Sequence, residues 1–497
     1  MPENVLIHSF LQQSALSYPD KTALKQGKEQ VSYKELAQHA GQISQWLLHH
    51  NLQPGDRVAI LTDQACEYVS AYFGILAAGG IVIGLNTQTS NHALSSVLAD
   101  SGSSIVLSHR KFKKYASVIN AQTSVRHFET DIRSLWEKDS ANERITLPQI
   151  SSDDIGQIIY TSGTTGAPKG VMLRHRNLVA NTHSIIEYLG LSECDIIMAV
   201  LPFFYSYGNS VLLTHIAVGS TLIVNQSFLY PNVILDQMVE EEVTGFSGVP
   251  SSFAILLNRS AVRKYTFPKL RYLTQAGAAM SPILAENLST VFPDVDIFIM
   301  YGQTEASARL SFLSPERLVD KAGSIGKATP GVTLKICRPD GTNAEIDEVG
   351  EIVARGENIM AGYWQQPQET EKVLKNKDLW TGDLARVDKD GFLFIESRKS
   401  DMIKSGSHRI APKEIEDIIM ETSYIHEVAV VGHDDKILGE KIVAFSVLKK
   451  DCDISEKELL RHCRRKLPAF KVPHEIIFQS ELPKTATGKI KKTELKK

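Results

Sequence analysis

One run of residues, Tyr160–Gly170, constrains this chain more than any other segment, because it mixes glycines, hydroxyl side chains and one lysine. Residues 155–160 are mostly apolar, which predicts a buried strand that delivers the run to the edge of a sheet. Glycines allow tight turns and close approach of a ligand, while exposed amides and hydroxyls can donate hydrogen bonds to phosphate oxygens. The run therefore predicts a loop that holds phosphate groups.

Two other interpretations of the run compete with this one. A cluster of glycine, serine, threonine and proline often forms only a surface turn. The P-loop of nucleotide hydrolases has the spacing G-x-x-x-x-G-K-[ST], but here Gly163, Gly166 and Lys169 lie three residues apart and a glycine follows the lysine. The P-loop motif is therefore not matched, although Lys169 still offers a compact positive charge to phosphate.

The run Thr161–Gly170 is similar to the signature of the adenylate-forming superfamily, which includes acyl-CoA synthetases, peptide-synthetase adenylation domains and beetle luciferases. Further segments resemble the same family in the same order: residues 301–305 (Tyr-Gly-Gln-Thr-Glu), 381–384 (Thr-Gly-Asp-Leu), 398 with 403–406 (Arg, then Ile-Lys-Ser-Gly) and 483–489 (Pro-Lys-Thr-Ala-Thr-Gly-Lys). The resemblance spans residues 160–489. It implies an enzyme that uses ATP and Mg²⁺ to activate a carboxylic acid.

The order of apolar segments predicts the fold class. Apolar runs of strand length alternate with longer amphipathic stretches, which predicts an α/β architecture with mixed sheets. From residue 323 to 396 the pattern changes to short apolar runs separated by turn residues, which predicts a small antiparallel, β-barrel-like unit. Within it, residues 388–395 predict a hairpin and the polar residues 396–401 a linker. The strand-length runs are residues 105–107, 196–200, 221–224 and 297–300.

The length of 497 residues predicts at least two domains. After the linker, the pattern predicts a compact α+β unit of about one hundred residues, a common domain size. We therefore expect a large N-terminal domain of several subdomains over residues 1–399 and a small C-terminal domain over residues 400–497. The resemblance implies that the small domain is mobile and rotates between two half-reactions. Its predicted elements are helices at 412–421 and 455–467 and strands at 426–432 and 441–449.

The composition limits the binding partners and the cellular compartment that we expect. The formal net charge is −3 and the basic runs 461–466 and 489–497 lack interleaved aromatic residues, so we expect no nucleic-acid partner. These runs predict a solvated helix and tail, or else a site for the phosphates of coenzyme A or an acidic carrier protein. Five scattered cysteines indicate reduced thiols rather than a disulfide framework. We expect a soluble protein of the cytoplasm.

Two features near the start of the chain support this expectation. The first residues lack the basic and apolar segments of a secretory signal. The apolar stretch 68–85 is long enough to raise the question of a membrane span, but Gly79 and Gly80 divide it. A buried helix ending near Ala78, a glycine turn and a strand over residues 81–85 explain the stretch better.

The chemistry of acid activation explains the residue types in the motifs. A carboxylate and a triphosphate repel each other, so the site needs fixed positive charges, hydrogen-bond donors and a divalent cation around the α-phosphate. The resemblance implies that Thr304 contacts the α-phosphate and that Glu305 coordinates magnesium, which prefers carboxylate and phosphate oxygens. It also implies that Lys489 reaches from the C-terminal domain to the carboxylate and the α-phosphate. The predicted catalytic residues are Lys489, Thr304, Glu305 and Lys169.

The resemblance also assigns the nucleoside contacts. The small residues Gly277–Ala279 would let adenine approach the backbone, and Tyr301 is available to stack against the base. Asp383 suits the ribose hydroxyls, although an aspartate in such a turn often only caps its own backbone. Arg398 resembles a second ribose contact. The predicted nucleotide-binding residues are Thr161, Ser162, Gly163, Thr164, Thr165, Gly166, Lys169, Gly277, Ala278, Ala279, Tyr301, Gly302, Thr304, Asp383, Arg398 and Lys489.

The sequence around residues 201–208 bears on which acid is used. Relatives that bind α-amino acids carry an aspartate where this chain has Ser206, and a buried ammonium group without an ionic partner would be costly. The segment instead resembles that of synthetases for fatty and other apolar acids, with Tyr205 at the mouth of the acyl pocket. We expect an apolar acid of fatty or aryl type. The predicted substrate contacts are Tyr205, Ser206, Tyr207, Gly248 and Ala306.

Two positions depart from the pattern of the family. Ser400 stands where relatives usually have aspartate or lysine at the hinge, and Ser407 stands where many have a glycine along the path of the thiol. Both bear on the second half-reaction. We expect an AMP-forming acid–thiol ligase whose acceptor is coenzyme A or a separate acyl carrier protein. The alternatives are an acyl-AMP ligase that serves only a carrier protein, a nucleotide-binding protein that forms no thioester, and, more distantly, a luciferase-like monooxygenase.

Overall fold

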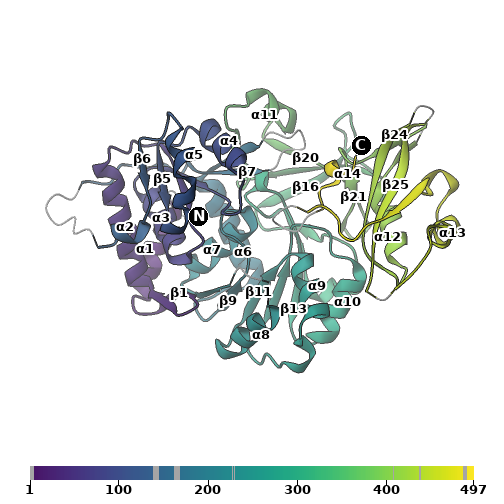
Figure 1. Ribbon diagram of the computed structural model, residues 1–497, viewed down its shortest axis with the longest axis horizontal. Coiled ribbons are helices and arrows are strands. Elements are labelled where there is room, and N and C mark those ends of the chain that lie inside the picture. The colour runs from purple at the N-terminus through teal and green to yellow at the C-terminus, as the bar shows by residue number, and fades with distance from the viewer. Residues whose placement is uncertain are drawn as a thin grey trace.

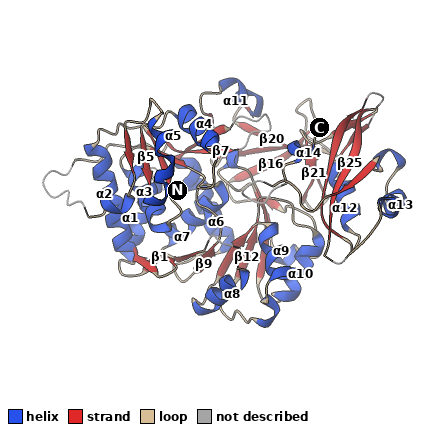
Figure 2. Ribbon diagram, viewed as in Figure 1, coloured by secondary structure: helices blue, strands red, loops and turns tan. Residues whose placement is uncertain are grey.

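The structure of the protein is a computed structural model in which sheets and helices alternate in layers (Figure 1). The colours of Figure 2 show helices on both outer faces of the N-terminal part and between its sheets. The described residues are 5–137, 145–161, 168–225, 228, 230–406, 408–435, 438–450, 452–484 and 490–496.

The first sheet has the strand order β15-β14-β13-β12-β11-β9-β10-β1-β2. From β13 to β1 its strands are parallel, and β2, β14 and β15 join the ends of the sheet in antiparallel fashion. Its strands are β1 (Thr22–Gln26), β2 (Glu29–Ser32), β9 (Ile196–Ala199), β10 (Thr221–Val224), β11 (Gly245–Gly248), β12 (Tyr272–Gln275), β13 (Asp296–Tyr301), β14 (Ser311–Leu313) and β15 (Lys327–Ala328).

The second sheet has the order β18-β8-β7-β4-β3-β5-β6. It is parallel from β7 to β6, while β8 and β18 are antiparallel to their neighbours. Its strands are β3 (Arg57–Leu61), β4 (Ile81–Gly84), β5 (Ile105–Ser108), β6 (His127–Glu129), β7 (Ile155–Thr161), β8 (Lys169–Arg174) and β18 (Gly362–Tyr363).

Helices fill the space between these two sheets and cover their outer faces. One apolar core joins both sheets through α1, α3, α6 and α7. Separate cores attach α8, α9 and α10 to the first sheet and α4 and α5 to the second. The N-terminal helices are α1 (Ile7–Ser17), α2 (Tyr33–His49), α3 (Ala65–Ala77), α4 (Asn91–Ser101), α5 (Ala116–Asn120), α6 (His175–Leu189), α7 (Ser206–Val218), α8 (Pro231–Glu240), α9 (Pro250–Arg259), α10 (Pro282–Val291) and α11 (Pro367–Val373).

Local sequence determines where several of these elements begin and end. Ser32 and Glu35 form a reciprocal capping box at the start of α2. The apolar stretch 68–85 divides as predicted, because α3 ends at Ala77, Gly79 adopts a φ of 79° and β4 follows. Within the described residues, no helix combines the length and the apolar character needed to cross a bilayer.

The third sheet is antiparallel, as the turn-rich pattern predicted. Its order is β16-β17-β20-β19, and β21 pairs with the later part of β20, residues 383–387. The predicted polar linker over residues 396–401 was wrong in its first half: β21 continues to Arg398, because Arg398 pairs with Asp383 across the ladder. The strands are β16 (Val332–Cys337), β17 (Gly350–Gly356), β19 (Leu374–Lys375), β20 (Asp378–Val387) and β21 (Leu393–Arg398).

The C-terminal unit has a sheet and a core of its own and lies at one end of the molecule (Figure 1). The sheet has the order β23-β22-β25-β24, with β26 beside β25. The two helices and two strands predicted for this unit are present, and their ends differ from the prediction by at most three residues. The elements are β22 (Ile403–Ser405), β23 (His408–Ile410), α12 (Pro412–Met420), β24 (Ile425–Asp435), β25 (Gly439–Leu448), α13 (Glu456–Lys466), β26 (Glu475–Phe478) and α14 (Lys492–Leu495).

Candidate nucleotide and acyl site

Several predicted site residues lie at the carboxyl ends of parallel strands. Thr161 ends β7, Gly248 ends β11 and Tyr301 ends β13, while Gly277 follows β12 by two residues. In open α/β sheets, ligands bind in the crevice outside these strand ends. The topology therefore gathers residues that are far apart in the sequence at edges suited to a ligand.

Lys169, the lysine of the predicted phosphate loop, lies at the start of β8, opposite Thr161 in the β7–β8 ladder. Its Nζ atom lies 2.7 Å from Glu369 Oε2 on α11 and 5.1 Å from the centre of the Tyr363 ring. Hydrogen bonds from Lys169, and then from Lys372, lower the pKa of Glu369 to about 2. The five loop positions Ser162, Gly163, Thr164, Thr165 and Gly166 lie outside the described residues.

Glu305 presents a carboxylate suited to a magnesium ion. It belongs to the short 3₁₀ helix η4 (Thr304–Ala306), and its backbone carbonyl accepts a hydrogen bond from Met360 N at 2.9 Å. The Tyr363 hydroxyl donates to Glu305 Oε1 at 2.8 Å. Burial is the main cause that raises the pKa of Tyr363, and the charge of Glu305 is the second. No described residue donates to Oε2. A carboxylate oxygen held this way can ligate Mg²⁺, which prefers oxygen donors.

Tyr301, Asp383 and Arg398 form a polar triad that joins β13 to the third sheet. The Tyr301 hydroxyl donates to Asp383 Oδ2 at 2.7 Å, and Arg398 Nε lies 2.8 Å from Asp383 Oδ1. The charge of Asp383 raises the pKa of Arg398, whereas burial is the main cause that raises the pKa of Tyr301. Each carboxylate oxygen has a second lone pair, so Asp383 can still accept from a hydroxyl group.

The segment predicted to contact adenine, residues 277–279, consists of small side chains. Gly277 adopts a φ of 92°, which favours glycine, and Gln275 Nε2 donates to the carbonyl oxygen of Ala278 at 2.7 Å. Residues 277–279 are exposed. Their backbone is therefore accessible to a ligand.

The predicted acyl contacts lie around the start of α7. Ser206 Oγ lies 3.2 Å from Thr304 Oγ1, which connects this helix to the segment predicted to hold the α-phosphate. Asn86 Nδ2 donates to the Tyr205 hydroxyl at 3.3 Å. Tyr207 is buried, and its hydroxyl donates to the carbonyl oxygen of Thr274 at 2.9 Å. The remaining contacts, Gly248 at the end of β11 and Ala306 in η4, are both buried.

The backbone just after η4 is strained. Ser307 and Ala308 have φ values of 60° and 146°, a range that side chains other than glycine rarely adopt. Asn358 Nδ2 holds the strained turn by donating to the carbonyl oxygens of Ala306 and Arg309. Gly302 is required beside it, because a Cβ there would lie 1.9 Å from the carbonyl oxygen of Ala308.

The sequence did not indicate four residues of this region: Tyr363, Glu369, Asn358 and Arg309. Each acts through a contact with a distant segment, and none lies in a motif that has a local pattern of its own. Two residues that the sequence did single out, Lys489 and Ser407, lie outside the described residues. Their predicted roles stay predictions.

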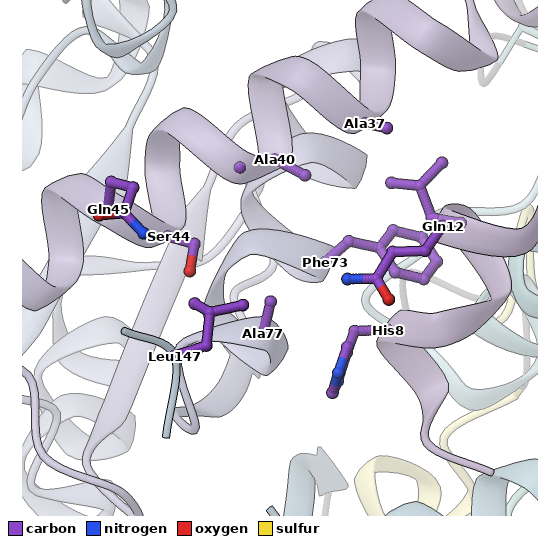
Figure 3. Close-up of a pocket in the computed structure, with 11 residues that line it drawn as sticks. His8, Gln12, Ala37, Ala40, Ser44, Gln45, Phe73, Ala77 and Leu147 are labelled. Carbon is purple, nitrogen blue, oxygen red and sulfur yellow. The ribbon is translucent and has the colours of Figure 1, made fainter. Parts of the chain in front are cut away.

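A separate cavity of about 110 Å³ lies between α1, α2 and α3. Figure 3 shows His8 and Gln12 of α1 and Ser44 of α2 around it, with Phe73 of α3 and Leu147. None of its lining residues is among the predicted site residues. Burial lowers the pKa of His8 to about 4, so this imidazole is neutral at physiological pH.

Comparison with known proteins agrees with this arrangement. The AMP-binding enzyme family matches residues 11–364, and the AMP-binding enzyme C-terminal domain matches residues 414–489. The chain is 31% identical to a long-chain-fatty-acid–CoA ligase of Bacillus subtilis, with 98% of this chain and 93% of that protein covered. It is 32% identical to the 2-succinylbenzoate–CoA ligase of the same organism, with 98% and 97% covered.

Solved structures extend the comparison to the fold. The AMP complex of O-succinylbenzoate coenzyme A synthetase from Bacillus subtilis superposes with a TM-score of 0.88 at 31% identity, covering 98% of each chain. The same enzyme has also been solved with ATP and a magnesium ion.

Fold and site together define an enzyme that transfers a nucleotidyl group from ATP. The chain belongs to the AMP-binding enzyme family, and it is an adenylate-forming, acid–thiol ligase of the acyl-CoA synthetase type that uses ATP and Mg²⁺.

Proposed function

We propose that this protein activates an apolar carboxylic acid of fatty or aryl type to its acyl-AMP and then transfers the acyl group to coenzyme A, in the cytoplasm. The observation that carries the proposal is that Lys169 and Glu305 both contact Tyr363, and that Glu305 follows Tyr301 of the Tyr301–Asp383–Arg398 triad by four residues. The relatives that act on long-chain fatty acids and on 2-succinylbenzoate support the acid class and the acceptor. The five cysteines are free thiols, which fits a reducing compartment.

Electrostatics explains why these residues suit the first half-reaction. Lys169 and the phosphate loop would hold the β- and γ-phosphates, and Thr304 would donate to the α-phosphate. A magnesium ion on Glu305 would supply Lewis-acid charge neutralisation at the phosphate oxygens. The carboxylate of the acid can then attack the α-phosphorus, and pyrophosphate leaves. Losing one such fixed donor typically raises the barrier by about 3 kcal/mol.

The second half-reaction would need a rearrangement of the C-terminal unit. We propose that residues 1–399 and 400–497 are the two domains, and that Lys489 acts in the first half-reaction only. Rotation about Ser400 would withdraw Lys489 and admit the thiol of coenzyme A. The sulfur then attacks the acyl carbonyl carbon, and AMP is the leaving group.

A separate acyl carrier protein is a second candidate for the acceptor. Arg461, Arg464 and Arg465 lie on α13, are exposed and form no ion pair within the described part of the chain. Their spacing places them on one face of the helix. Such a face suits an acidic carrier protein as well as the phosphates of coenzyme A.

Acid-dependent exchange of labelled pyrophosphate into ATP tests the first half-reaction. We expect exchange with at least one member of a panel of fatty, aryl and amino acids, and none from the amino acids. Thioester formation with coenzyme A, compared with a phosphopantetheinylated carrier protein, then identifies the acceptor. If no acid supports exchange, the proposed function is wrong.

A matched pair of lysine variants tests the role of Lys489 in the same assay. We expect Lys489→Ala to abolish exchange while the fold, followed by circular dichroism, is retained. Lys491 is the control, because it is a nearby lysine whose Nζ pairs with Glu494 at 2.8 Å on the surface. Lys491→Ala should exchange normally, and near-normal exchange by Lys489→Ala would refute the assigned role.

A further inference from the structure

Tyr363 contacts two charged side chains that come from different parts of the site. Its hydroxyl donates to Glu305 Oε1 at 2.8 Å, and Lys169 Nζ lies 5.1 Å from the centre of its ring. Tyr363 is buried, with 7% of its surface exposed, whereas Glu305 and Lys169 are half-buried and can still reach a ligand. One tyrosine thus connects the carboxylate suited to magnesium with the lysine suited to phosphate.

Hydrogen bonds fix the backbone on either side of this tyrosine. Three residues before it, Met360 N donates to the carbonyl oxygen of Glu305 at 2.9 Å. One residue after it, Trp364 N donates to the carbonyl oxygen of Gly170, which directly follows Lys169, at 2.7 Å. The same short segment is therefore bound to the backbone of η4 and to that of β8, and it holds the ring in place without a ligand.

A hydrogen bond of this kind can orient a metal ligand. Carboxylates that ligate a metal are usually hydrogen-bonded themselves, and the partner fixes the orientation of the carboxylate. The Tyr363 hydroxyl donates to one oxygen of Glu305, and no described residue donates to the other, which is therefore available to a hard cation. The face of an aromatic ring attracts an ammonium group, so the same side chain also restricts Lys169.

We propose that Tyr363 is a positioning residue for the activation of the acid. Its hydroxyl holds the Glu305 carboxylate in one orientation for magnesium, and its ring restricts the ammonium group of Lys169. Because both side chains are already ordered, less conformational entropy is lost when the magnesium complex of ATP binds. This inference rests on the proposed function, and in particular on the role of Glu305.

The alternative is a tyrosine that serves only to pack the interior. Its ring does belong to the main apolar core. A packing role would affect stability, and it would weaken ATP binding equally with and without metal. A positioning role requires the metal ion, and it requires a carboxylate at position 305 that can bind the ion. The two roles therefore differ in how the effect of a Tyr363 variant depends on magnesium.

Isothermal titration with ATP, in excess Mg²⁺ and in EDTA, measures this dependence. The ratio of the Kd in EDTA to the Kd in Mg²⁺ is here called the magnesium advantage. We expect Tyr363→Phe to lower it by about 10-fold or more, as is typical when a metal ligand loses its hydrogen-bond partner. Its Kd in EDTA should stay within about twofold of the parent value, because the phenyl ring keeps the contact with Lys169. Tyr363→Leu, which also removes the ring, should raise the Kd in EDTA by about two- to fivefold.

Variants of Glu305 show whether Tyr363 acts through this carboxylate. Glu305→Gln should lose the magnesium advantage, and adding Tyr363→Phe should then change it by less than about twofold, because residues that act through one contact are not additive. Tyr265→Phe is the matched control, since it removes a tyrosine hydroxyl that donates to a different carboxylate, Asp236 Oδ1, at 2.6 Å. This control should change neither Kd.

The results separate the two roles of Tyr363. An unchanged magnesium advantage in Tyr363→Phe, equal weakening in Mg²⁺ and in EDTA, or additive losses in the double variant would overturn the inference. A magnesium advantage that survives Glu305→Gln would overturn the role of Glu305 and the inference with it, whereas acid-dependent pyrophosphate exchange decides the proposed function separately. If Tyr363→Phe does not fold, Glu305→Asp replaces it, because the shorter side chain keeps the charge and withdraws from the hydroxyl. Full retention of the magnesium advantage in Glu305→Asp would likewise overturn the inference.

Discussion

At the scale of single residues, the site is built from groups that already have partners inside the protein. Asp383 accepts from Tyr301 and pairs with Arg398, and Lys169 pairs with Glu369. A nucleotide must therefore add a hydrogen bond to Asp383, which keeps its partners, and must compete with Glu369 for the ammonium group of Lys169. The two arrangements predict opposite effects of removing a carboxylate.

Asp383→Asn should weaken nucleotide binding. The substitution removes the negative charge that raises the pKa of Arg398, and it replaces the carboxylate that accepts from the Tyr301 hydroxyl. The ribose therefore loses a fixed, charged acceptor. Hydrogen bonds to a charged group contribute about 1.5–3 kcal/mol, which corresponds to a 10- to 100-fold rise in Kd for ATP. Isothermal titration with ATP measures it. Tyr301→Phe, which removes one hydrogen bond and keeps the charge, should have a smaller effect, and an unchanged Kd in Asp383→Asn would contradict the role.

Glu369→Gln should strengthen ATP binding instead. Glu369 holds the Nζ atom of Lys169 at 2.7 Å, and the β- and γ-phosphates would need the same ammonium group. Removing the competing charge should lower KM for ATP by about two- to fivefold, as expected for a partly exposed ion pair. Glu371→Gln changes an exposed neighbour on the same helix and serves as the control. A raised KM in Glu369→Gln would mean that the carboxylate positions Lys169 rather than competing for it.

At the scale of elements, the sequence predicted what local patterns determine. The strand before the phosphate loop, the glycine-divided stretch 68–85, and the two helices and two long strands predicted after residue 400 follow from apolar periodicity and turn residues. The polar linker was placed too early because Glu396, Ser397 and Arg398 look like a loop by composition. Their place in β21 depends on pairing with β20, which no local pattern reveals.

The same reasoning separates the predicted part of the site from the rest. The motif residues of η4 and of β20 were recognisable because their segments resemble a family signature. Tyr363 reaches Glu305 across 58 positions of sequence, and Asn358 reaches Arg309 across 49. Such contacts depend on how β18 docks beside β8, so they become visible only in the folded chain.

Gly302→Ala should disrupt the turn that carries η4. The added Cβ would lie 1.9 Å from the carbonyl oxygen of Ala308, which belongs to backbone that Asn358 fixes. Overpacking of this kind typically destabilises by about 1–3 kcal/mol, and exchange activity should fall with it because Thr304 and Glu305 shift. Thermal denaturation and the exchange assay measure the two effects.

Gly41→Ala is the matched control for that substitution. Nothing lies within 4 Å of a Cβ at Gly41, which is in the interior of α2. Alanine is favoured over glycine in a helix by up to about 1 kcal/mol, so this variant should be as stable as the parent or more stable. Equal Tm values for Gly302→Ala and the parent protein would show that the turn is less rigid than its contacts indicate.

At the scale of the whole molecule, the apolar cores are separate on the two sides of the proposed domain boundary. The cores of the N-terminal sheets contain no residue beyond Ile395, and the cores of the C-terminal unit contain none before Ile403. Within the described residues no apolar core therefore crosses the proposed boundary at residues 399 and 400. Hydrogen bonds do cross it, such as that from Ser397 Oγ to Met402 Sδ at 2.9 Å and that from Asp401 N to the carbonyl oxygen of Arg398 at 3.0 Å.

A chain cut at this boundary should separate nucleotide binding from catalysis. Residues 1–399 keep their own cores, the Lys169 ion pair and the whole Tyr301–Asp383–Arg398 triad, so this fragment should fold and bind ATP with a Kd within about threefold of the full chain, a difference under 1 kcal/mol. It lacks Lys489 and should therefore show no pyrophosphate exchange. Residues 400–497 should unfold cooperatively on their own, as a unit with a separate core does. Circular dichroism, ATP titration and the exchange assay on the two fragments check these outcomes, and exchange by residues 1–399 alone would remove the need for a catalytic group in the C-terminal domain.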